Sequence, residues 1–317
     1  MTQKTSKQSD KDKEVHDVVM IGAGPAALAA AVYTTREDIQ TVLYEKGVIG
    51  GLAAITDWVD NYPGYAEGVS GMDLSEELRK QAERFGAEIR LGEVTNITNE
   101  GKLKKLETTD GEIYARAVLI ATGSDYKKIG VPGEQEYYGR GVHYCATCDG
   151  AFYRDKHLVV VGGGNSAAQE SLFLTRFATK IDMLVRSKLS ASDVLIHELE
   201  NHPKINIHLQ TTTDEIVGEN GKVTKVVGTH NNKKVEFKTD GVFVFVGLKP
   251  NTQFLKSSNI KLDEIGFVIT DSTKLQTNME GVFAAGDVRS GATMQIASAV
   301  GEGATAALRI REYLEGK

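Results

Sequence analysis

The strongest constraint on the fold is a pattern that occurs twice: a short apolar strand, a glycine-rich turn and a helix. The first copy places the apolar residues 18–21 directly before Gly22-Ala23-Gly24 and an Ala-rich helical run. The second copy places residues 158–161 before Gly162-Gly163-Gly164 and another helical run. A glycine turn between a buried strand and a helix lets backbone N–H groups approach a pyrophosphate. The sequence therefore predicts an α/β protein with two Rossmann-like dinucleotide-binding units.

The residues of the first turn suit dinucleotide binding individually. Gly22 permits the tight turn, Gly24 lets the backbone come close to a ligand, and Ala27 is small enough for close helix packing. A second strand, residues 41–44, leads to Glu45, which follows Gly24 by 21 residues, close to the spacing of an acid that bonds the adenosine ribose. The turn alone is weak evidence, but the strand, helix and acid together favour dinucleotide binding over an ordinary tight turn.

The second unit lacks an acid at the corresponding place. Its second strand, residues 181–185, is followed by Arg186-Ser187-Lys188. This segment offers no carboxylate for the ribose hydroxyls of NAD, and only Arg186 and Lys188 for the 2′-phosphate of NADP. The pattern leaves the dinucleotide preference of this unit open.

Both cysteines of the chain lie in one stretch, Cys145-Ala146-Thr147-Cys148-Asp149-Gly150. A C-x-x-C pair can close a small disulfide ring and often carries a thiol of lowered pKa that attacks other disulfides. A zinc site would need more ligands than the chain offers here, because no second cysteine pair exists and His143 and Asp149 could help only in part. A disulfide across two residues restrains the unfolded chain little. We therefore interpret the stretch as a redox centre and expect no metal.

Bulk properties exclude several classes of function. A net charge of −6 and a pI near 5.7 argue against a surface for nucleic acid or anionic membranes, which would need a concentrated basic patch. Residues 1–15 form a polar, Lys-rich stretch that we expect to be a disordered tail, with neither a signal peptide nor a membrane span in the chain. We expect a cytoplasmic protein, and thiols in that compartment are kept reduced, which makes a lone C-x-x-C more suited to catalysis than to stability.

The remaining patterns predict a helix over residues 72–85 and a small antiparallel sheet over residues 88–114. Towards the C terminus, a short strand over residues 282–285 precedes Gly286-Asp287, and a long helix follows over residues 294–314. An acid directly after a buried strand suits a carboxylate that bonds ribitol or pyrophosphate hydroxyls, although a capping role is the alternative.

With these motifs in view, the chain resembles the low-molecular-weight thioredoxin reductases of bacterial and archaeal type, a class of pyridine nucleotide-disulfide oxidoreductase. The resemblance extends from about residue 17 to the C terminus, and C-A-T-C-D-G is highly specific for the family. The other matching motifs, in order, are Gly22-Ala23-Gly24-Pro25-Ala26-Ala27, Gly50-Gly51-Leu52, Asn61-Tyr62-Pro63-Gly64, Ala121-Thr122-Gly123, Gly162-Gly163-Gly164-Asn165-Ser166 and Ala285-Gly286-Asp287-Val288. Glutathione-reductase-like enzymes instead place their cysteines in the first domain, where this chain has none.

The resemblance implies a discontinuous FAD-binding domain, residues 16–123 and 248–317, interrupted by an NAD(P)-type domain, residues 124–247, that carries the cysteines. It also implies a homodimer, and a twisting of the domains at hinges near Gly123-Ser124 and Val246-Gly247. In the family's mechanism, a donor reduces the flavin, the flavin passes two electrons to the cysteine pair, and the dithiol reduces the disulfide of thioredoxin, a separate chain.

The roles of the family's residues carry over to the matching positions. Cys145 and Cys148 would be the redox pair, with Cys148 nearer the flavin, and Asp149 would be the acid that protonates a leaving thiolate or the reduced flavin; the reverse assignment of the cysteines stays open. The residues expected to bind FAD are Gly22, Gly24, Pro25, Ala26, Glu45, Lys46, Gly51, Leu52, Asn61, Ala121, Thr122, Gly123, Gly286, Asp287, Gln295 and Ile296. Those expected to bind a nicotinamide dinucleotide are Gly162, Gly164, Asn165, Ser166 and Arg186.

The donor site departs from the family's pattern. The family reads NADPH with a His-Arg-Arg run and a further Arg downstream, whereas this chain has Val185-Arg186-Ser187, with Ser190 and Ala191 beyond. Asn165 also replaces the usual Asp, and Met294 stands where an Arg is usual. Each lost charge-assisted hydrogen bond is worth about 1.5 to 3 kcal/mol, so affinity for the 2′-phosphate should fall several-fold to hundreds-fold. We expect weak or absent NADPH use, with NADH, reduced ferredoxin or another reductant as the donor.

Two rival functions remain open. One is a reductase of a peroxiredoxin, a glutaredoxin-like protein or a small disulfide rather than of thioredoxin. The other is a non-catalytic flavoprotein that senses redox state, which would show flavin and a titratable disulfide but negligible turnover. The intact disulfide, acid and flavin motifs favour an enzyme, because only the donor site has changed.

Overall fold

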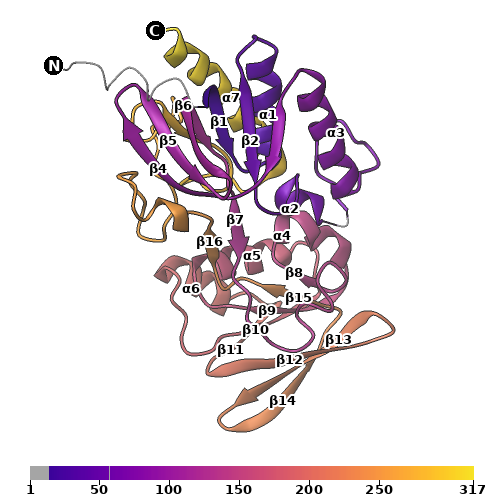
Figure 1. Cartoon of the computed structure of the whole chain (residues 1–317). Coiled ribbons are helices and arrows are strands. Elements are labelled where there is room, and N and C mark those ends of the chain that lie inside the picture. Colours follow the sequence, from indigo (N-terminus) through magenta and orange to yellow (C-terminus); the bar gives the residue numbers. More distant parts are fainter. Residues whose placement is uncertain (1–13, 57) are drawn as a thin grey trace, which may run out of the picture. The chain divides into compact units, whose positions relative to one another are not determined.

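The computed structural model describes residues 14–56 and 58–317, and it divides the chain into two compact units (Figure 1). The discontinuous unit comprises the chain up to Asp125 together with Lys249–Lys317, and the inserted unit is Tyr126–Leu248. The domain boundaries expected from the sequence lie at 123/124 and 247/248. Most of the predicted N-terminal tail, residues 1–13, lies outside the described residues, and its last residue, Val15, begins the first strand.

The discontinuous unit is built on a seven-stranded sheet in the order β3-β2-β1-β6-β5-β4, with β17 also paired to β6. Its strands are β1 Val15–Ile21, β2 Thr41–Glu45, β3 Glu88–Leu91, β4 Val94–Glu100, β5 Leu103–Thr108, β6 Gly111–Ile120 and β17 Val282–Ala284. The strands β1, β2, β3 and β17 run parallel to their neighbours, whereas β4, β5 and the first half of β6 form an antiparallel meander. The last residues of β6 are thus free to pair with β17, a strand from the far end of the chain.

The helices of this unit are α1 Pro25–Thr35, α2 Gly51–Ala54, α3 Gly71–Arg84, the short 3-10 helix η2 Gln253–Leu255 and α7 Ile296–Leu314. Helix α1 is Ala-rich and almost wholly buried, so small side chains let neighbouring elements pack closely around it. Near the start of α1, helix α7 comes so close that a Cβ on Gly303 would lie 2.1 Å from the carbonyl oxygen of Ala26. Only glycine fits there, which ties α7 to the first glycine turn.

The inserted unit has a parallel sheet in the order β11-β10-β9-β15-β8 and a separate antiparallel sheet in the order β12-β13-β14. The parallel strands are β8 Val142–His143, β9 His157–Val161, β10 Lys180–Leu184, β11 Ile205–His208 and β15 Gly241–Val244. The antiparallel strands are β12 Thr211–Glu219, β13 Lys222–His230 and β14 Lys233–Lys238. The helices are α4 Ala146–Asp149, η1 Gly150–Tyr153, α5 Asn165–Leu174 and α6 Asp193–Glu200. Parallel strands that alternate with helices are thus present in both units, which confirms the predicted fold class.

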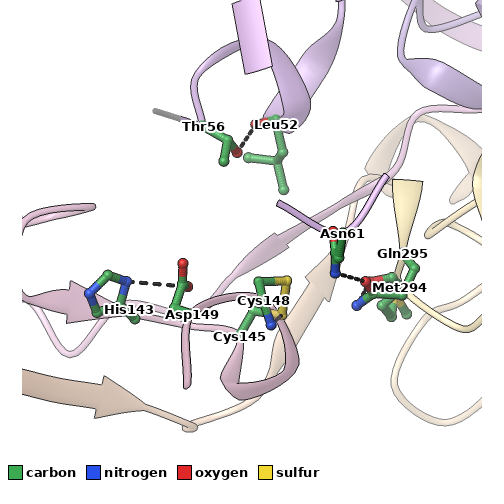
Figure 2. Close-up of a disulfide and its surroundings, with 9 residues drawn as sticks. All are labelled: Leu52, Thr56, Asn61, His143, Cys145, Cys148, Asp149, Met294 and Gln295. Atoms are coloured by element: carbon green, nitrogen blue, oxygen red, sulfur yellow. Dashed lines mark hydrogen bonds and ion pairs between the residues drawn. A yellow bond between two sulfur atoms is a disulfide. The ribbon is translucent and has the colours of Figure 1, made fainter. Parts of the chain in front are cut away.

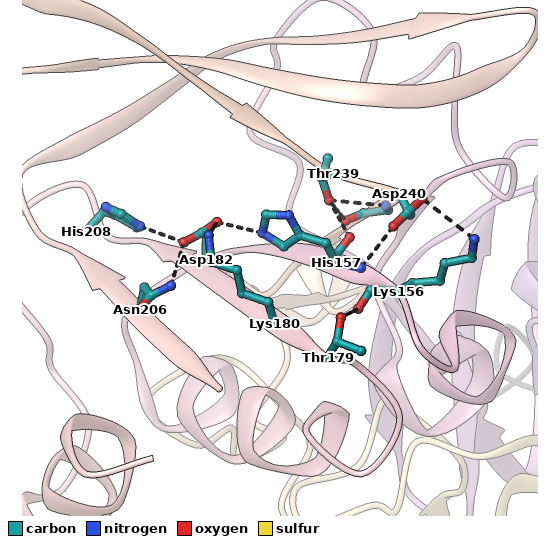
Figure 3. A network of polar contacts seen from close by, with 10 residues as sticks. Lys156, His157, Thr179, Lys180, Asp182, Asn206, His208, Thr239 and Asp240 are labelled. Atoms are coloured by element: carbon teal, nitrogen blue, oxygen red, sulfur yellow. Dashed lines mark hydrogen bonds and ion pairs between the residues drawn. The ribbon is translucent and has the colours of Figure 1, made fainter. Parts of the chain in front are cut away.

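A buried carboxylate ties three strands of the inserted unit together (Figure 3). Asp182 of β10 is 3% exposed and contacts Lys180 at 2.8 Å, His157 of β9 at 2.6 Å and His208 of β11 at 2.9 Å. Asn206 donates a fourth hydrogen bond. Burial opposes ionisation, but these hydrogen bonds outweigh it and lower the pKa of Asp182 to about 2. The ionised carboxylate therefore links β9, β10 and β11 at neutral pH.

The chain crosses between the units twice, through β7 Ser124–Tyr126 and β16 Leu248–Pro250, which pair with each other. A positive φ precedes each crossing, +66° at Gly123 and +109° at Gly247, a conformation that glycine adopts without strain. Within the described part of the chain, the helices are all too short or too polar to cross a bilayer.

Candidate redox and cofactor sites

The two cysteines form a disulfide at the start of helix α4, with their Cα atoms 5.3 Å apart. Cys145 is the N-cap of this helix, and its sulfur accepts a hydrogen bond from the backbone N–H of Cys148 at 3.2 Å. The N–H of Asp149 closes the turn on the carbonyl oxygen of Cys145 at 3.1 Å. After reduction, the same N–H of Cys148 would stabilise a thiolate on Cys145, because hydrogen bonds favour the charged form of the group that accepts them.

The residue after Asp149 has a packing role. A Cβ on Gly150 would lie 2.9 Å from Cδ2 of Leu174 and close to the ring of Phe177. Glycine at this position therefore lets the redox turn lie directly against α5 and the residues that follow it. From the same helix, Glu170 accepts a hydrogen bond from the backbone N–H of Ala146; burial nevertheless raises its pKa.

An imidazole lies beside the redox turn (Figure 2). Nδ1 of His143 is 3.2 Å from Oδ2 of Asp149, and Nε2 is 2.7 Å from the hydroxyl of Tyr153. His143 ends β8, Asp149 ends α4 and Tyr153 ends η1, so three consecutive elements converge here. The expected acid, Asp149, thus has a buried histidine as its neighbour, a pairing that no sequence pattern predicts. Among the described residues, no group of three or more His, Cys, Asp and Glu side chains is arranged to hold a metal ion.

The first glycine turn and Glu45 form one cradle in the discontinuous unit. A Cβ on Gly22 would lie 2.5 Å from the carbonyl oxygen of Ala121, so this position needs glycine. Gly24 faces open space and caps α1 without a side-chain hydrogen bond. The Glu45 carboxylate accepts hydrogen bonds from the backbone N–H groups of Ala23 at 2.8 Å and Gly47 at 2.7 Å.

Two further expected FAD residues, Ala121 and Gly286, follow strands that end at the same edge of the sheet. The ends of β2, β1, β6 and β17 are neighbours in the sheet, and they lead into Glu45, Gly22, Ala121 and Gly286. This carboxyl edge of parallel strands is where α/β proteins bind dinucleotides. Asn61 and Gln295, 234 positions apart, are joined by a side-chain hydrogen bond of 3.1 Å (Figure 2).

The residues of this cradle fit FAD chemically. Burial, with a smaller contribution from Glu302, raises the pKa of Asp287 to about 6. A carboxyl group in such surroundings gains from a hydroxyl donor, which the ribitol chain of FAD provides. Glu302, which sequence reasoning did not single out, accepts a hydrogen bond from the N–H of Gly286 at 2.8 Å and pairs with Arg289. No periodicity or motif marked this pair.

The second glycine turn can be compared with the first through hydrogen bonds to the neighbouring strand. Gly22 N–H donates to the carbonyl of Tyr44, and Gly162 N–H donates to the carbonyl of Leu184. The next residue is Glu45 in the first unit and Val185 in the second. Val185 is 2% exposed, and a Cβ on Gly163 would lie 2.7 Å from its Cγ1. An apolar side chain therefore occupies the place that the Glu45 carboxylate takes in the first unit.

The loop after β10 is tied back to the second glycine turn. Ser190 N–H donates to the carbonyl of Gly163 at 2.7 Å, and Ser192 N–H donates to Oδ1 of Asn165 at 2.8 Å. Arg186 and Lys188 are exposed. The loop thus presents two single cations and no arginine pair at the place where a 2′-phosphate would lie.

A cysteine pair in a Rossmann-type unit, in a chain with a second dinucleotide cradle, defines the pyridine nucleotide-disulphide oxidoreductases, and the model of that family matches residues 16–303. Within this class, the chain belongs to the thioredoxin reductase family. It is 43% identical over 307 residues to the thioredoxin reductase of Bacillus subtilis strain 168, with 96% of each protein covered.

Solved structures agree with this membership. The thioredoxin reductase from Streptococcus pyogenes MGAS5005 has a TM-score of 0.91 and 38% identity, covering 96% of this chain and 100% of the other. The enzyme from Giardia duodenalis has the same TM-score, 0.91, at 32% identity and the same coverage of both chains, 96% and 100%. These matches confirm the family and the fold class expected from the sequence.

Proposed function

We propose that this protein is an FAD-dependent reductase that passes two electrons through Cys145 and Cys148 to the disulfide of thioredoxin. The observation that carries the proposal is the cysteine pair at the start of α4, followed directly by Asp149. Membership of the thioredoxin reductase family supports thioredoxin as the partner, and the same relationship supports a homodimer, which light scattering of the purified protein would test.

The residues of the discontinuous unit would hold the cofactor. Glu45 would accept the hydroxyls of the adenosine ribose, the turn at Gly22 and Gly24 would approach the pyrophosphate, and Asp287 would accept a ribitol hydroxyl. Bound FAD supplies a ring that takes up two electrons from a donor and delivers them to the disulfide. Lys46, Gly51, Leu52, Thr122, Gly123, Pro25, Ala26, Asn61, Gln295 and Ile296 complete the proposed FAD site.

In the inserted unit, the reduced cysteines would carry out thiol–disulfide exchange. A thiolate on Cys145 is stabilised by the N–H of Cys148 and attacks one sulfur of the partner's disulfide. The partner's second sulfur leaves and takes a proton, for which Asp149 is the nearest acid in the sequence. Cys148 then attacks the Cys145 sulfur of the mixed disulfide, and the partner's first sulfur leaves and takes the proton of Cys148. Two electrons and two protons thereby pass from the enzyme dithiol to the partner.

We propose that NADPH is a poor donor and that reduced ferredoxin, or another reductant without a nicotinamide, serves in its place. The turn at Gly162, Gly164, Asn165 and Ser166 keeps the shape of a dinucleotide site, so weak binding through Arg186 is retained. Val185 provides no carboxylate for the ribose of NADH, which also disfavours that donor.

Anaerobic stopped-flow absorbance tests the donor and the acceptor separately. The flavin band is followed after mixing with NADPH, NADH or reduced ferredoxin, and we expect rapid bleaching only by ferredoxin. Photochemically reduced enzyme is then mixed with oxidised thioredoxin, and C145S and C148S should each abolish complete turnover. Rapid bleaching by NADPH at micromolar concentration would refute the donor proposal, and wild-type enzyme that leaves thioredoxin oxidised would refute the acceptor.

A further inference from the structure

The exchange step needs a group that holds a proton at neutral pH and returns it to the leaving thiolate. We infer that His143 is a positioning residue that acts through Asp149, so that the His143–Asp149 pair, rather than the carboxyl group alone, stores this proton. The inference rests on the proposed exchange chemistry of the same cysteine pair, and it names a residue that the family motif C-A-T-C-D-G does not contain.

Packing fixes the imidazole in place. His143 is 7% exposed, and its ring stacks on Phe243 with centroids 5.2 Å apart and 29° between the planes. Tyr153 meets the ring edge-on at 5.3 Å. The backbones of His143 and Phe243 are paired across β8 and β15, so the stacking partner is set by strand register. The ring orientation therefore does not depend on the contact with Asp149.

Both nitrogens of this fixed ring face a group that can exchange a proton. Burial is the main reason that the pKa of Tyr153 is raised, so its phenol remains protonated and can donate to Nε2 at 2.7 Å. A neutral imidazole that accepts at Nε2 must carry its hydrogen on Nδ1, which lies 3.2 Å from the Asp149 carboxylate. Tyr153 thus selects the tautomer that hydrogen-bonds to Asp149.

The pair has room for one more proton. A neutral imidazole and a carboxylate joined by one hydrogen bond can together bind one further proton, held between Nδ1 and Oδ2. The charged or titratable groups around the ring are Asp149 from α4 and Tyr153 from η1, and Asp240 acts electrostatically on Tyr153. Phe243, from β15, carries no charge.

The proton balance of the exchange closes with this pair. One enzyme thiolate attacks the partner, the partner's S–S bond breaks, and the leaving sulfur takes the proton of the pair. The second enzyme thiol then gives its proton to the pair as it attacks the mixed disulfide. The enzyme disulfide re-forms and the partner's released thiolate takes this proton, so the partner gains two electrons and two protons. The pair regains its own proton when the next enzyme dithiol forms its thiolate. Figure 2 shows Asp149 between His143 and the disulfide, where such a transfer would occur.

The test uses His143→Asn, which keeps an N–H donor near Asp149 but cannot hold a proton. Pre-reduced holoenzyme is mixed with oxidised thioredoxin, and in parallel with the chromogenic disulfide dithiobis-nitrobenzoate, over about pH 5 to 9. The wild-type rate should show an inflection near neutrality; H143N should lose it and be slower by about tenfold or more at the optimum. Y153F should shift the inflection without removing it, and H197N, on the exposed face of α6, should match the wild type.

A second measurement needs no partner. Reduced protein is alkylated with iodoacetamide over the same pH range, and mass spectrometry follows Cys145 and Cys148 separately. We expect H143N to lose the inflection near neutrality that the wild-type profile shows. Wild-type rate and alkylation profiles in a folded, flavin-loaded H143N would overturn the inference. If the wild type reduces neither disulfide, the proposed function fails and the alkylation profiles alone decide the role of His143.

Discussion

The substitution Val185→Glu tests directly why the inserted unit should bind NADH poorly. Val185 corresponds to Glu45 through the matching hydrogen bonds of Gly22 and Gly162 to the neighbouring strand. Glu45 accepts the N–H of Ala23 at 2.8 Å, and the residue in the place of Ala23 is Gly163, which lies against Val185. A glutamate at position 185 therefore has a backbone donor in reach and can turn its second oxygen towards a ribose.

The expected gain follows from one charge-assisted hydrogen bond. A bond to a charged group contributes about 1.5 to 3 kcal/mol, which corresponds to about 10- to 150-fold in affinity. Moving a carboxylate into the place of a buried valine costs part of this gain, because the charge loses water. We therefore expect V185E to improve the apparent affinity for NADH by about 10-fold, at the lower end of that range. Affinity for NADPH should fall, since a carboxylate repels the 2′-phosphate.

The assay is the rate of flavin reduction as a function of NADH concentration, measured anaerobically for wild type, V185E and V185Q. V185Q has the size of glutamate without its charge and should gain much less. Flavin content and circular dichroism show whether each variant is folded. A folded V185E with the NADH dependence of the wild type would refute the idea that Val185 limits nicotinamide binding.

Three further substitutions address the fold and the cofactor cradle. G303A should force α7 away from the carbonyl of Ala26, cost about 1–3 kcal/mol and weaken FAD binding, measured as flavin fluorescence released on dilution. G301A, whose added Cβ meets nothing within 4 Å, is the control, and equal effects of the two would contradict this reasoning. D182N should destabilise the inserted unit by about 2–4 kcal/mol, seen as faster amide hydrogen exchange in β9–β11. Because the pKa of Asp182 is lowered to about 2, its stabilisation should persist above about pH 4 and disappear as the pH falls towards 2, and unchanged exchange in D182N would count against the network. D287N should stabilise the FAD-free protein by about 1–3 kcal/mol at pH 7 while weakening FAD binding, because a carboxyl whose pKa is raised to about 6 destabilises the fold when it ionises. That gain should vanish near pH 4 in urea titrations, and a gain that stays constant with pH would show that charge is not its cause.

The features that could be predicted are those written in local patterns. The two glycine turns, Glu45 at the end of its strand, and the helix expected over residues 72–85, found as Gly71–Arg84, all depend on neighbours in the sequence. The strand over residues 282–285 was also predicted, but its pairing with β6 follows from no spacing rule. The family resemblance implied only that the C-terminal segment belongs to the same domain as the first strand.

The features that could not be predicted join residues without any periodic relation. Asp182 meets His157 and His208 only because β9, β10 and β11 lie side by side. Glu302 reaches Gly286 from the next helix, and its place in the sequence resembles any exposed helical glutamate. His143 precedes Cys145 by two residues, yet its contact with Asp149 depends on the path of the backbone from the end of β8 through α4. Such contacts are decided by the folded backbone.

The pairing of β17 with β6 has a consequence for synthesis of the chain. All of Tyr126–Leu248 is synthesised before Val282–Ala284 and the final helix. The inserted unit can therefore complete its sheets while the other half still shows an unpaired strand edge at β6 and an uncovered face of α1. A nascent chain stalled before residue 282 should thus be protease-resistant only in its middle, and it should acquire flavin only after its last residues emerge.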